Sequence, residues 1–414
     1  MKTAIVIGAG FVGAACAWQL QRAGFQCTVF DPGEASAAAS WGNAGHLAIE
    51  QIDPLASISN LRSLPGRLFA FGGPVGLPLH DVDAWLPFGI RLVAASTPAR
   101  FATGRRVLSA LLSEAMPAWQ RLVDQTKTDS LLRVDGHFVV WESQKTASVG
   151  KRNWLHADIG KARVETATQD ELRALQVRFN RRPVDALRFH NTGQILDLPK
   201  MREGILQSLR KQGVKLEKIA ARSLESHSGR AAVRLADGPL LNADVVVVAA
   251  GIGSAALLPA FESVIPLIAE RGYHLDSASS DVSGGIHLPP VAFEDRSVIV
   301  TEFMSSLRIA GFTEFSRGDA KPDPRKWRRL LHHARALGLP IGIDAGQWVG
   351  SRPTLPDYLP AIGKSHQASN LFYAFGHQHL GVTLAALTGE LVASLACGVD
   401  PAVDLRPLHL DRFH

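Results

Sequence analysis

Three glycines near the start of the chain are spaced as in loops that bind a pyrophosphate. Gly8, Gly10 and Gly13 form a G-x-G-x-x-G segment, with Phe11 and Val12 between the last two. The first glycine allows a tight turn, the second lets the backbone approach a pyrophosphate, and the third lets a helix pack closely on a strand. The free N–H groups that open the following helix attract phosphates. We therefore predict that this segment binds a dinucleotide.

The flanking residues predict the elements that would position this loop. Residues 3–7 predict a strand, 12–23 a helix that ends at Gly24, and 26–30 a second strand. Asp31 ends that strand, where a carboxylate can hydrogen-bond both ribose hydroxyls and disfavours a 2′-phosphate. The alternative is a strand–helix–strand turn without a ligand, and the motif alone does not separate FAD from NAD.

Further segments combine glycine with polar side chains. They are 40–46 (Ser-Trp-Gly-Asn-Ala-Gly-His), 348–353 (Trp-Val-Gly-Ser-Arg-Pro) and 376–381 (Gly-His-Gln-His-Leu-Gly). Another segment, 243–251, is a run of valine and alanine that ends at a glycine. Such a continuous apolar run predicts a parallel strand that is buried on both faces.

Together, these segments resemble the D-amino acid oxidase/dehydrogenase family, which includes glycine oxidase and the bacterial D-amino acid dehydrogenases. The resemblance spans residues 3 to about 400 and is strongest at the two ends. It implies bound FAD, a second domain over the flavin, and oxidation of an amino acid to an imino acid. The S-x-x-N-A-G form of 40–45 looks more like the dehydrogenase branch than the oxidase branch.

The resemblance also implies which residues contact the flavin cofactor. The turn at 376–381 precedes a helix whose first amides could stabilise the negative charge of a reduced flavin. Beyond the first glycine loop and Asp31, the expected cofactor residues are Ser40, Asn43, Ala44, Gly45, Ala249, Gly251, Gly350, Gly376, Leu380, Gly381, Val382 and Thr383.

Arg352 is the natural anchor for a substrate carboxylate, because a guanidinium can hold a carboxylate with two parallel hydrogen bonds. The resemblance implies the same role for the arginine of this G-x-R-P segment. The alternative is an ion pair at the surface or between domains.

Three side chains are further candidates for the catalytic centre, and a fourth for a substrate contact. His46 follows the 40–45 turn and is expected near the flavin ring. Tyr273 and His274 follow an Arg-Gly pair, where family members place substrate contacts. His379 stands where glycine oxidase carries an arginine, so it either contacts a polar group of the substrate or packs against it.

The favoured mechanism needs no acid or base from the protein, because a neutral amine lone pair assists hydride transfer from Cα to the flavin. The leading hypothesis is a D-amino acid dehydrogenase that passes electrons to a quinone or another carrier. The Gly-His-Gln-His-Leu-Gly form adds cyclic imino acids such as D-proline or D-hydroxyproline to the candidate substrates. One alternative is an oxidase that uses O₂ on glycine or an N-methyl amino acid. Another is a non-catalytic FAD-binding subunit, which Arg352 argues against.

Bulk composition limits the partners. The 414 residues are 46% apolar and 20% charged, as in an ordinary globular protein of two or three domains. A formal charge of +6 could attract anionic partners, but the basic residues are scattered and lack the basic-aromatic clusters of a nucleic-acid site. Three cysteines show no metal spacing, and no other metal motif occurs. We expect no nucleic-acid partner, no metal and a cytoplasmic protein.

Membrane contact is a separate question. No segment is predicted to span a bilayer. Residues 64–79 are apolar and rich in glycine and proline. A packed loop is the favoured interpretation, and a lid, a channel mouth or a membrane-touching loop are the alternatives. Any contact with the inner membrane is therefore expected to be peripheral, at the surface of the bilayer.

The predicted fold class is α/β, with a Rossmann-type FAD-binding domain and an interleaved α+β substrate domain that contains a mixed or antiparallel sheet. The FAD-binding domain takes 1–80, 191–255 and 345–414, and the substrate-binding domain takes 81–190 and 256–344. Besides the elements above, helices are predicted at 81–128, 165–176, 199–212, 327–337 and 383–396, and strands at 132–141, 214–218, 231–235, 297–300, 306–311 and 371–375.

Overall fold

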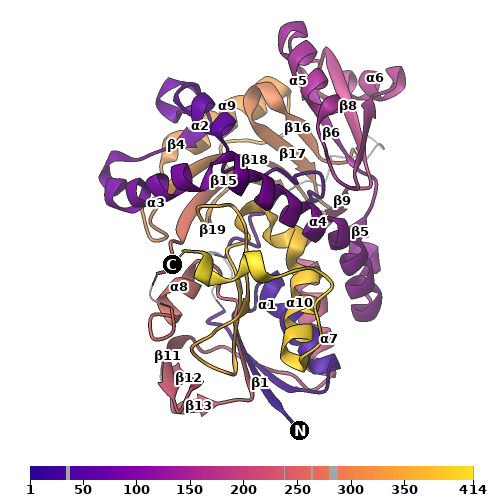
Figure 1. The fold of residues 1–414 in the computed structure, drawn as a ribbon. Helices are drawn as coiled ribbons and strands as arrows, with labels where there is room; N and C mark the ends of the chain where they lie inside the picture. Colours follow the sequence, from indigo (N-terminus) through magenta and orange to yellow (C-terminus); the bar gives the residue numbers. More distant parts are fainter. Residues whose placement is uncertain (34–37, 237, 263, 279–287, 414) are drawn as a thin grey trace.

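The protein is described by a computed structural model that covers residues 1–33, 38–236, 238–262, 264–278 and 288–413. Two large sheets make up the two halves of the molecule, one below the other in Figure 1. The chain passes between them several times, so each half is built from segments that are distant in sequence.

The lower sheet has six strands, because short runs of valine, isoleucine and phenylalanine pair in parallel with both faces buried. Only its last pair is antiparallel. Its strand order is β10 (Lys215–Glu217), β2 (Gln26–Phe30), β1 (Thr3–Ile7), β14 (Val245–Val248), β21 (Leu371–Phe375) and β20 (Ala361–Lys364).

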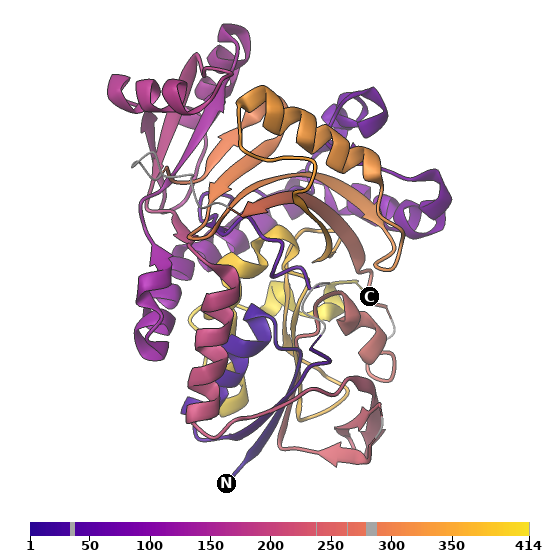
Figure 2. The same cartoon turned by 180° about the vertical axis from the view of Figure 1, so that it is seen from behind.

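Helices cover one face of the six-stranded sheet and share its core (Figures 1 and 2). They are α1 (Phe11–Arg22), α4 (Pro98–Thr126), α7 (Leu198–Lys211) and α10 (Gly381–Cys397). The other face packs on α8 (Ser254–Leu257) and on a small sheet of β11 (Ala221–His227), β12 (Arg230–Leu235) and β13 (Leu240–Asn242).

One helical segment, Gln378–Cys397, is long and apolar enough to cross a membrane by length and composition alone. Its most apolar stretch is 67% buried inside the molecule, where α10 packs against α1 and α4. A central core helix has the same composition, so the apolar character of α10 is explained by packing.

The upper sheet has nine strands of mixed direction. Its path is β19 (Gly346–Thr354), β15 (Ile268–Ala278), β18 (Ser306–Ser316), β17 (Val298–Glu302), β16 (Val291–Phe293), β6 (His137–Trp141), β8 (Asp185–His190) and β7 (Arg163–Thr166), with β4 (Val75–Gly76) beside β18.

Four helices surround the nine-stranded sheet. α9 lies along its outer face and buries leucines there, while α5 and α6 pack at the β6–β8 end (Figures 1 and 2). Their bounds are α3 (Val82–Ala95), α5 (Gln144–His156), α6 (Gln169–Arg178) and α9 (Pro324–Leu337). α2 (Ile58–Arg67) precedes them, and a small sheet of β3 (His46–Leu47), β9 (Gly193–Ile195) and β5 (Leu132–Arg133) lies apart from both large sheets.

Several sequence predictions need correction. The segment 165–176 is the end of β7 followed by α6, because Thr168 and Glu171 form a capping box that starts the helix at Gln169. The predicted strand at 132–141 is two strands in different sheets. β15, β19, β8 and α5 were not predicted at all.

Two elements also cross the predicted division between the parts of the chain. β19 lies in 345–414, which we assigned to FAD binding, yet it pairs with β15 in the nine-stranded sheet. α4 lies in 81–190, which we assigned to the substrate domain, yet it packs in the core of the six-stranded sheet. Both placements depend on contacts that are distant in sequence, which local periodicity does not report.

The close contact between α1 and the end of β1 can be tested by a substitution at Gly13. A Cβ atom on Gly13 would lie 1.9 Å from the Gly8 carbonyl oxygen. We expect Gly13→Ala to lower the free energy of unfolding by about 1–3 kcal/mol, because overpacking forces the backbone to shift. Gly89→Ala, in an open position of α3, should be neutral or stabilise by up to about 1 kcal/mol. Equal chemical-denaturation midpoints for the two variants would contradict this account.

Candidate functional site

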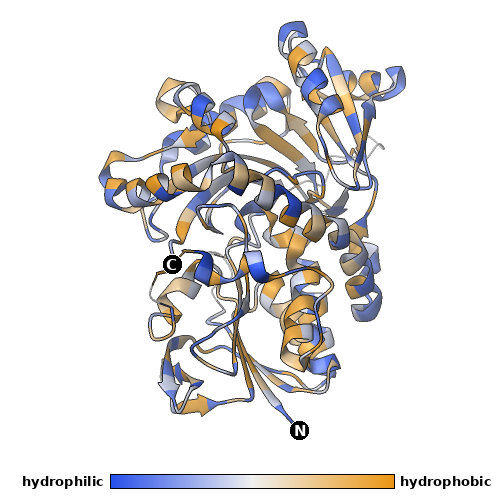
Figure 3. Ribbon diagram, viewed as in Figure 1, coloured by the Kyte–Doolittle hydropathy of each residue, from blue (hydrophilic) through white to orange (hydrophobic). Residues whose placement is uncertain are grey.

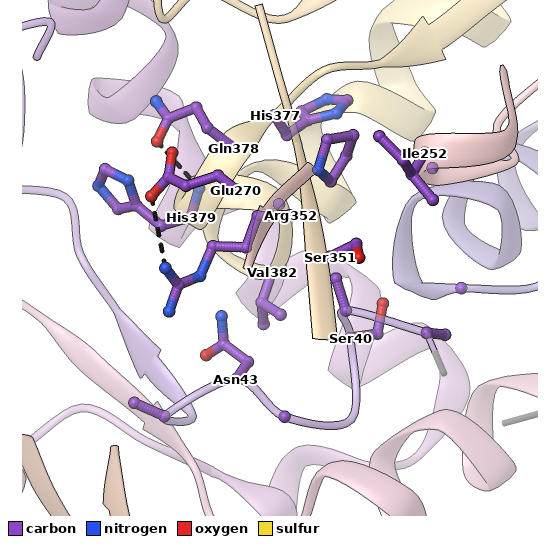
Figure 4. A pocket seen from close by; sticks show the side chains of 18 of the residues that line it. Ser40, Asn43, Ile252, Glu270, Ser351, Arg352, His377, Gln378, His379 and Val382 are labelled. Carbon is purple, nitrogen blue, oxygen red and sulfur yellow. Dashed lines mark hydrogen bonds and ion pairs between the residues drawn. The ribbon is translucent and has the colours of Figure 1, made fainter. Parts of the chain in front are cut away.

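A cavity of about 1080 Å³ lies between the two large sheets. The carboxyl ends of β1, β2 and β14 form one wall, and residues of β15, β17, β18 and β19 form another. Ligands of open α/β sheets bind at this edge of the strands. Figure 4 shows the part of the cavity around Arg352 and Glu270.

The glycine loop reaches the cavity through a close backbone contact. Gly8 has a φ of +105°, and a Cβ on it would lie 2.4 Å from the Ala249 carbonyl oxygen at the end of β14. Gly10 precedes α1 and offers no side-chain cap. The Phe11 amide donates a long hydrogen bond, 3.5 Å, to Ser40 Oγ, and the amides that follow it in the first turn remain available to a phosphate.

Asp31 lies where a ribose is expected. Its two carboxylate oxygens accept hydrogen bonds from the backbone amides of Ala9, at 2.7 Å, and Gly33, at 2.8 Å. Arg202 donates to the Ala9 carbonyl at 3.0 Å and stacks on the Trp41 ring at 4.7 Å. A carboxylate oxygen has lone pairs for more than one donor, so this wall fits a dinucleotide.

The segment 40–46 is held in place from the opposite sheet. Arg308 donates hydrogen bonds to the carbonyl oxygens of Trp41, at 3.0 Å, and Asn43, at 2.6 Å. The ring of Trp348 fits between Gly42 and Gly350, where a Cβ on either glycine would come within about 2.0 Å of the ring. These glycines give the aromatic ring room beside the cavity.

Arg352 and Glu270 mark the polar end of the cavity. They face each other on β19 and β15, and Arg352 Nη1 lies 3.4 Å from Glu270 Oε1. Thr354 Oγ1 donates to the other oxygen of Glu270 at 3.0 Å. The Arg352 side chain is 26% exposed, against 3% for Glu270. The guanidinium therefore keeps donors that face the cavity (Figure 4).

Two buried imidazoles in this part of the molecule are neutral. Burial lowers the pKa of His379 to about 4, and its Nε2 contacts Gln51 Oε1. Burial lowers the pKa of His137 to about 3, and its ring packs on His46 at 4.3 Å. His46 Nε2 lies 3.2 Å from Glu50 Oε1. Arg352, and neither His379 nor His137, therefore supplies positive charge at this end of the cavity.

The structure brings most of the predicted site residues to the wall of one cavity. Their roles stay predictions, but their positions agree with a shared site. The residues that line the cavity are Gly8, Gly10, Val12, Asp31, Ser40, Asn43, Ala44, His46, Ala249, Gly251, Arg352, His379, Gly381 and Val382.

Other predicted cofactor residues lie behind this wall. Phe11 packs between Trp41 and Trp119, and Thr383 accepts a hydrogen bond from the Ala48 amide at 3.1 Å. The remainder are buried or half-buried beside lining residues and do not reach the cavity themselves: Gly13, Gly45, Gly350, Gly376 and Leu380.

Tyr273 is a correction, because it does not face the cavity. It packs in the core beneath α9, donates a hydrogen bond to Glu314 at 2.9 Å and accepts one from the Asp323 amide at 3.1 Å. Neighbouring residues of a strand point to opposite faces, and Glu270 takes the cavity face of β15. His274 also stays outside the lining, stacked on Trp348 at 4.8 Å.

Sequence reasoning missed several lining residues. Glu270, Gln51, Arg202 and Trp348 all line the cavity. Glu270 could have been found from the sequence, because this acid directly follows the apolar residues Ile268 and Ala269. A buried acid needs a partner, which points to a polar site nearby. Gln51, Arg202 and Trp348 are positioned by contacts with segments more than a hundred residues away in the sequence, which local patterns do not report.

Comparison with known proteins identifies a family. The family model described as FAD dependent oxidoreductase (DAO) matches residues 3–395. A D-amino-acid oxidase of Bradyrhizobium diazoefficiens is 29% identical, with 99% of this chain and 98% of that protein covered. D-amino acid dehydrogenase 2 of Ralstonia nicotianae is 28% identical, with 98% and 99% covered. The predicted family resemblance and FAD dependence are thereby confirmed.

Solved structures confirm the fold class. Glycine oxidase from Geobacillus kaustophilus superposes with a TM-score of 0.72 at 21% identity, covering 99% of this chain and 98% of that one. L-proline dehydrogenase from P. horikoshii gives a TM-score of 0.74 at 15% identity, covering 100% and 97%. At these identities the likeness establishes the architecture alone.

His377 makes the stability of the folded chain dependent on pH. Burial lowers its pKa from 6.5 to about 3, and its Nε2 lies 3.0 Å from Thr388 Oγ1. The unfolded chain binds a proton here below about pH 6.5, whereas the folded chain does so only near pH 3. The free energy of unfolding should therefore fall as the pH is lowered through this window.

We expect His377→Gln to make this fall shallower in urea titrations of the holoenzyme between pH 7.5 and pH 5. The same change at His156, which is exposed on α5, should keep the wild-type profile. Parallel profiles for wild type and His377→Gln would show that this imidazole titrates normally.

Proposed function

Because the chain belongs to the family of FAD-dependent oxidoreductases, we propose that it is a dehydrogenase that oxidises a small D-amino acid to the imino acid. The residues that would hold FAD are the loop of Gly8 and Gly10, Asp31, and the turn before α10. The fit rests on two features: a loop whose side-chain space is closed by Ala249, and a helix that begins at a glycine without a side-chain cap.

The position of Arg352 carries the proposal. Its guanidinium lies at the wall of the cavity, held by Glu270 on one side and open on the other. A substrate carboxylate can take the open donors in a bidentate pair. A flavin that served only a structural role would have no use for such an anchor.

The side chains around Arg352 orient the substrate and exclude water. Bound FAD supplies the acceptor for the hydride that leaves Cα. Arg352 fixes the carboxylate end, which holds Cα in one place and removes the entropy cost of aligning it during the reaction. The neutral His379 and Gln51 close this end of the cavity without adding a second charge. The amine must react in its neutral form, so one proton leaves to solvent before the hydride does.

The substrate class and the acceptor are finer parts of this proposal. The Gly-His-Gln-His-Leu-Gly form of 376–381 favours a cyclic substrate such as D-proline or D-hydroxyproline. A quinone or another carrier is the proposed acceptor, as the dehydrogenase form of 40–45 suggests. The second candidate is an oxidase that uses O₂, which the name of the Bradyrhizobium relative favours.

Anaerobic reduction of the flavin by single amino acids tests the substrate class. Purified holoenzyme mixed anaerobically with single amino acids should lose its visible flavin band with a D- or cyclic amino acid, and not with the L-enantiomers. Turnover with a dye acceptor should exceed turnover with O₂. A band bleached by glycine or N-methyl amino acids, with fast O₂ consumption, would favour the oxidase. A band that no amino acid bleaches would overturn the proposal.

Substitutions of Arg352 test its role as the carboxylate anchor. Arg352→Met should raise the KM of the amino acid about a hundredfold, because losing one member of a buried charge pair costs about 2–5 kcal/mol. The KM of Arg352→Lys should lie between those of wild type and Arg352→Met, since an ammonium keeps the charge but does not form the bidentate pair.

The control separates binding from folding. Arg352→Met leaves Glu270 buried without its cation, so the double variant Arg352→Met/Glu270→Gln removes both charges. It should regain thermal stability and keep the raised KM. A normal KM in the double variant would show that the carboxylate binds elsewhere.

A further inference from the structure

His46, Glu50 and His137 form a buried cluster at the edge of the main cavity. Each offers one nitrogen or oxygen atom, and these atoms all lie within 4.8 Å of one another. The rings of His46 and His137 are 4.3 Å apart. The side chains of His46 and Glu50 are 9% and 3% exposed. Imidazole and carboxylate groups are ligands of zinc and of other divalent transition metals.

Two distant parts of the chain bring the cluster together. His46 begins β3 and Glu50 follows it, in a segment that lines the main cavity. His137 begins β6 of the nine-stranded sheet and is not one of the residues that line the cavity. The cluster therefore lies at the cavity wall and extends behind it. The spacing of residues could not predict such a site, because His137 is far from the other two in the sequence.

The contacts within the cluster leave polar atoms without partners. His46 Nε2 lies 3.2 Å from Glu50 Oε1. His46 Nδ1 and Glu50 Oε2 are buried, and neither makes a hydrogen bond within the described part of the chain. Among the described residues, only His46 lies within ion-pair distance of Glu50. A buried carboxylate is costly unless a cation or hydrogen-bond donors compensate its charge.

The surroundings of the cluster add little compensation. β3 packs on α10, and Figure 3 shows that α10 is apolar along most of its length. Gln194 is the direct partner of His46 in the pairing of β3 and β9, and its buried Oε1 also finds no donor among the described residues. Side chains of such a pair share one face of the strands. A cation with a bound water molecule would supply what these acceptors lack.

His137 is oriented as a metal ligand would be. Its Nδ1 lies 3.0 Å from Thr192 Oγ1, and its ring stacks on Phe189 with the ring centres 4.4 Å apart. Imidazoles that bind a metal use their other ring nitrogen for a hydrogen bond of this kind, which fixes the ring. The Nε2 atom of His137 is therefore the one left for a metal.

We propose that His46, Glu50 and His137 bind a divalent transition-metal cation of the Zn²⁺ type. Zinc holds its ligand atoms at about 2.0–2.2 Å in a tetrahedron, so that neighbouring ligand atoms lie about 3.4 Å apart. The 3.2 Å between His46 Nε2 and Glu50 Oε1 is already of this size. Closing the cluster from a spacing of 4.8 Å moves each atom by less than about 1 Å. A water molecule completes the four ligands.

The cation ties the cavity wall to the nine-stranded sheet. Residues 46–51 border the cavity and meet α10 through the hydrogen bond from the Ala48 amide to Thr383, whereas His137 belongs to β6. A metal that joins the two fixes the position of the wall. This role involves no electron transfer, since Zn²⁺ has no redox chemistry. The site departs from the sequence expectation of no metal, and it does not depend on the proposed function.

Zinc binding by the holoenzyme tests the site without any substrate. The exposed cluster of His366, His409 and Asp411 offers a second set of ligands at the surface, so every variant carries His366→Gln. After chelation and dialysis against ZnCl₂, this background should retain one zinc per chain. Zinc should also raise its thermal midpoint, because only the folded chain binds the ion. A large excess of Mg²⁺ should not displace the zinc, since Mg²⁺ prefers oxygen ligands.

Two further variants separate metal binding from folding. Glu50→Gln keeps the size of the side chain and should lose stoichiometric zinc. Thr192→Val leaves all three ligands in place and removes only the hydroxyl that orients His137, so the zinc affinity should fall about tenfold to a hundredfold. His227→Gln, an exposed histidine of β11, should bind zinc like the background. All variants should keep their flavin content.

Equal zinc retention by the background, Glu50→Gln and Thr192→Val would indicate an adventitious ion only and would overturn the proposal. A background that retains no zinc would overturn it as well. If Glu50→Gln does not fold, the affinity of Thr192→Val against that of His227→Gln decides the outcome.

Discussion

The cross-strand pair of Glu270 and Arg352 is the contact on which the polar end of the cavity depends. The two residues are direct partners in the antiparallel pairing of β15 and β19, so backbone register alone places the cation beside the carboxylate. Glu270 is buried and held by Thr354, whereas Arg352 is open to the cavity. A buried carboxylate in a fixed place thus keeps a flexible side chain pointed at one spot, which is the preorganisation that an anchor for substrate requires.

The parts of the fold that sequence predicted are those whose signals are local. β1, β2 and β21 begin and end at the predicted residues, because short apolar runs between turns specify a buried parallel strand. The glycine loop was readable for the same reason, since its function needs closely spaced residues. β15 and β19 carry charges and glycines and have no clear alternation, so only their pairing across some eighty residues makes them strands.

It was harder to predict which residues of a strand point into the cavity than to predict where the strand lies in the sequence. The family resemblance drew attention to the segment around Tyr273, and that segment does border the cavity. It could not say which residues turn inward, because β15 carries charged side chains on both of its faces, Glu270 toward Arg352 and Arg271 toward Glu314. Glu270 lies on the cavity side, and Tyr273 joins a buried network of charged groups under α9.

The charge at the polar end of the cavity also depends on whether His379 is protonated. The family resemblance implies an arginine in glycine oxidase at the position of His379, and a second cation would hold a carboxylate more firmly. Here burial keeps His379 neutral, with a pKa of about 4, and Arg352 already shares its charge with Glu270. If Arg352 anchors the substrate as proposed, one partly neutralised cation holds the carboxylate, and contacts with the rest of the substrate must supply a larger share of the affinity. Such a site selects its amino acid by the shape and polarity of the side chain.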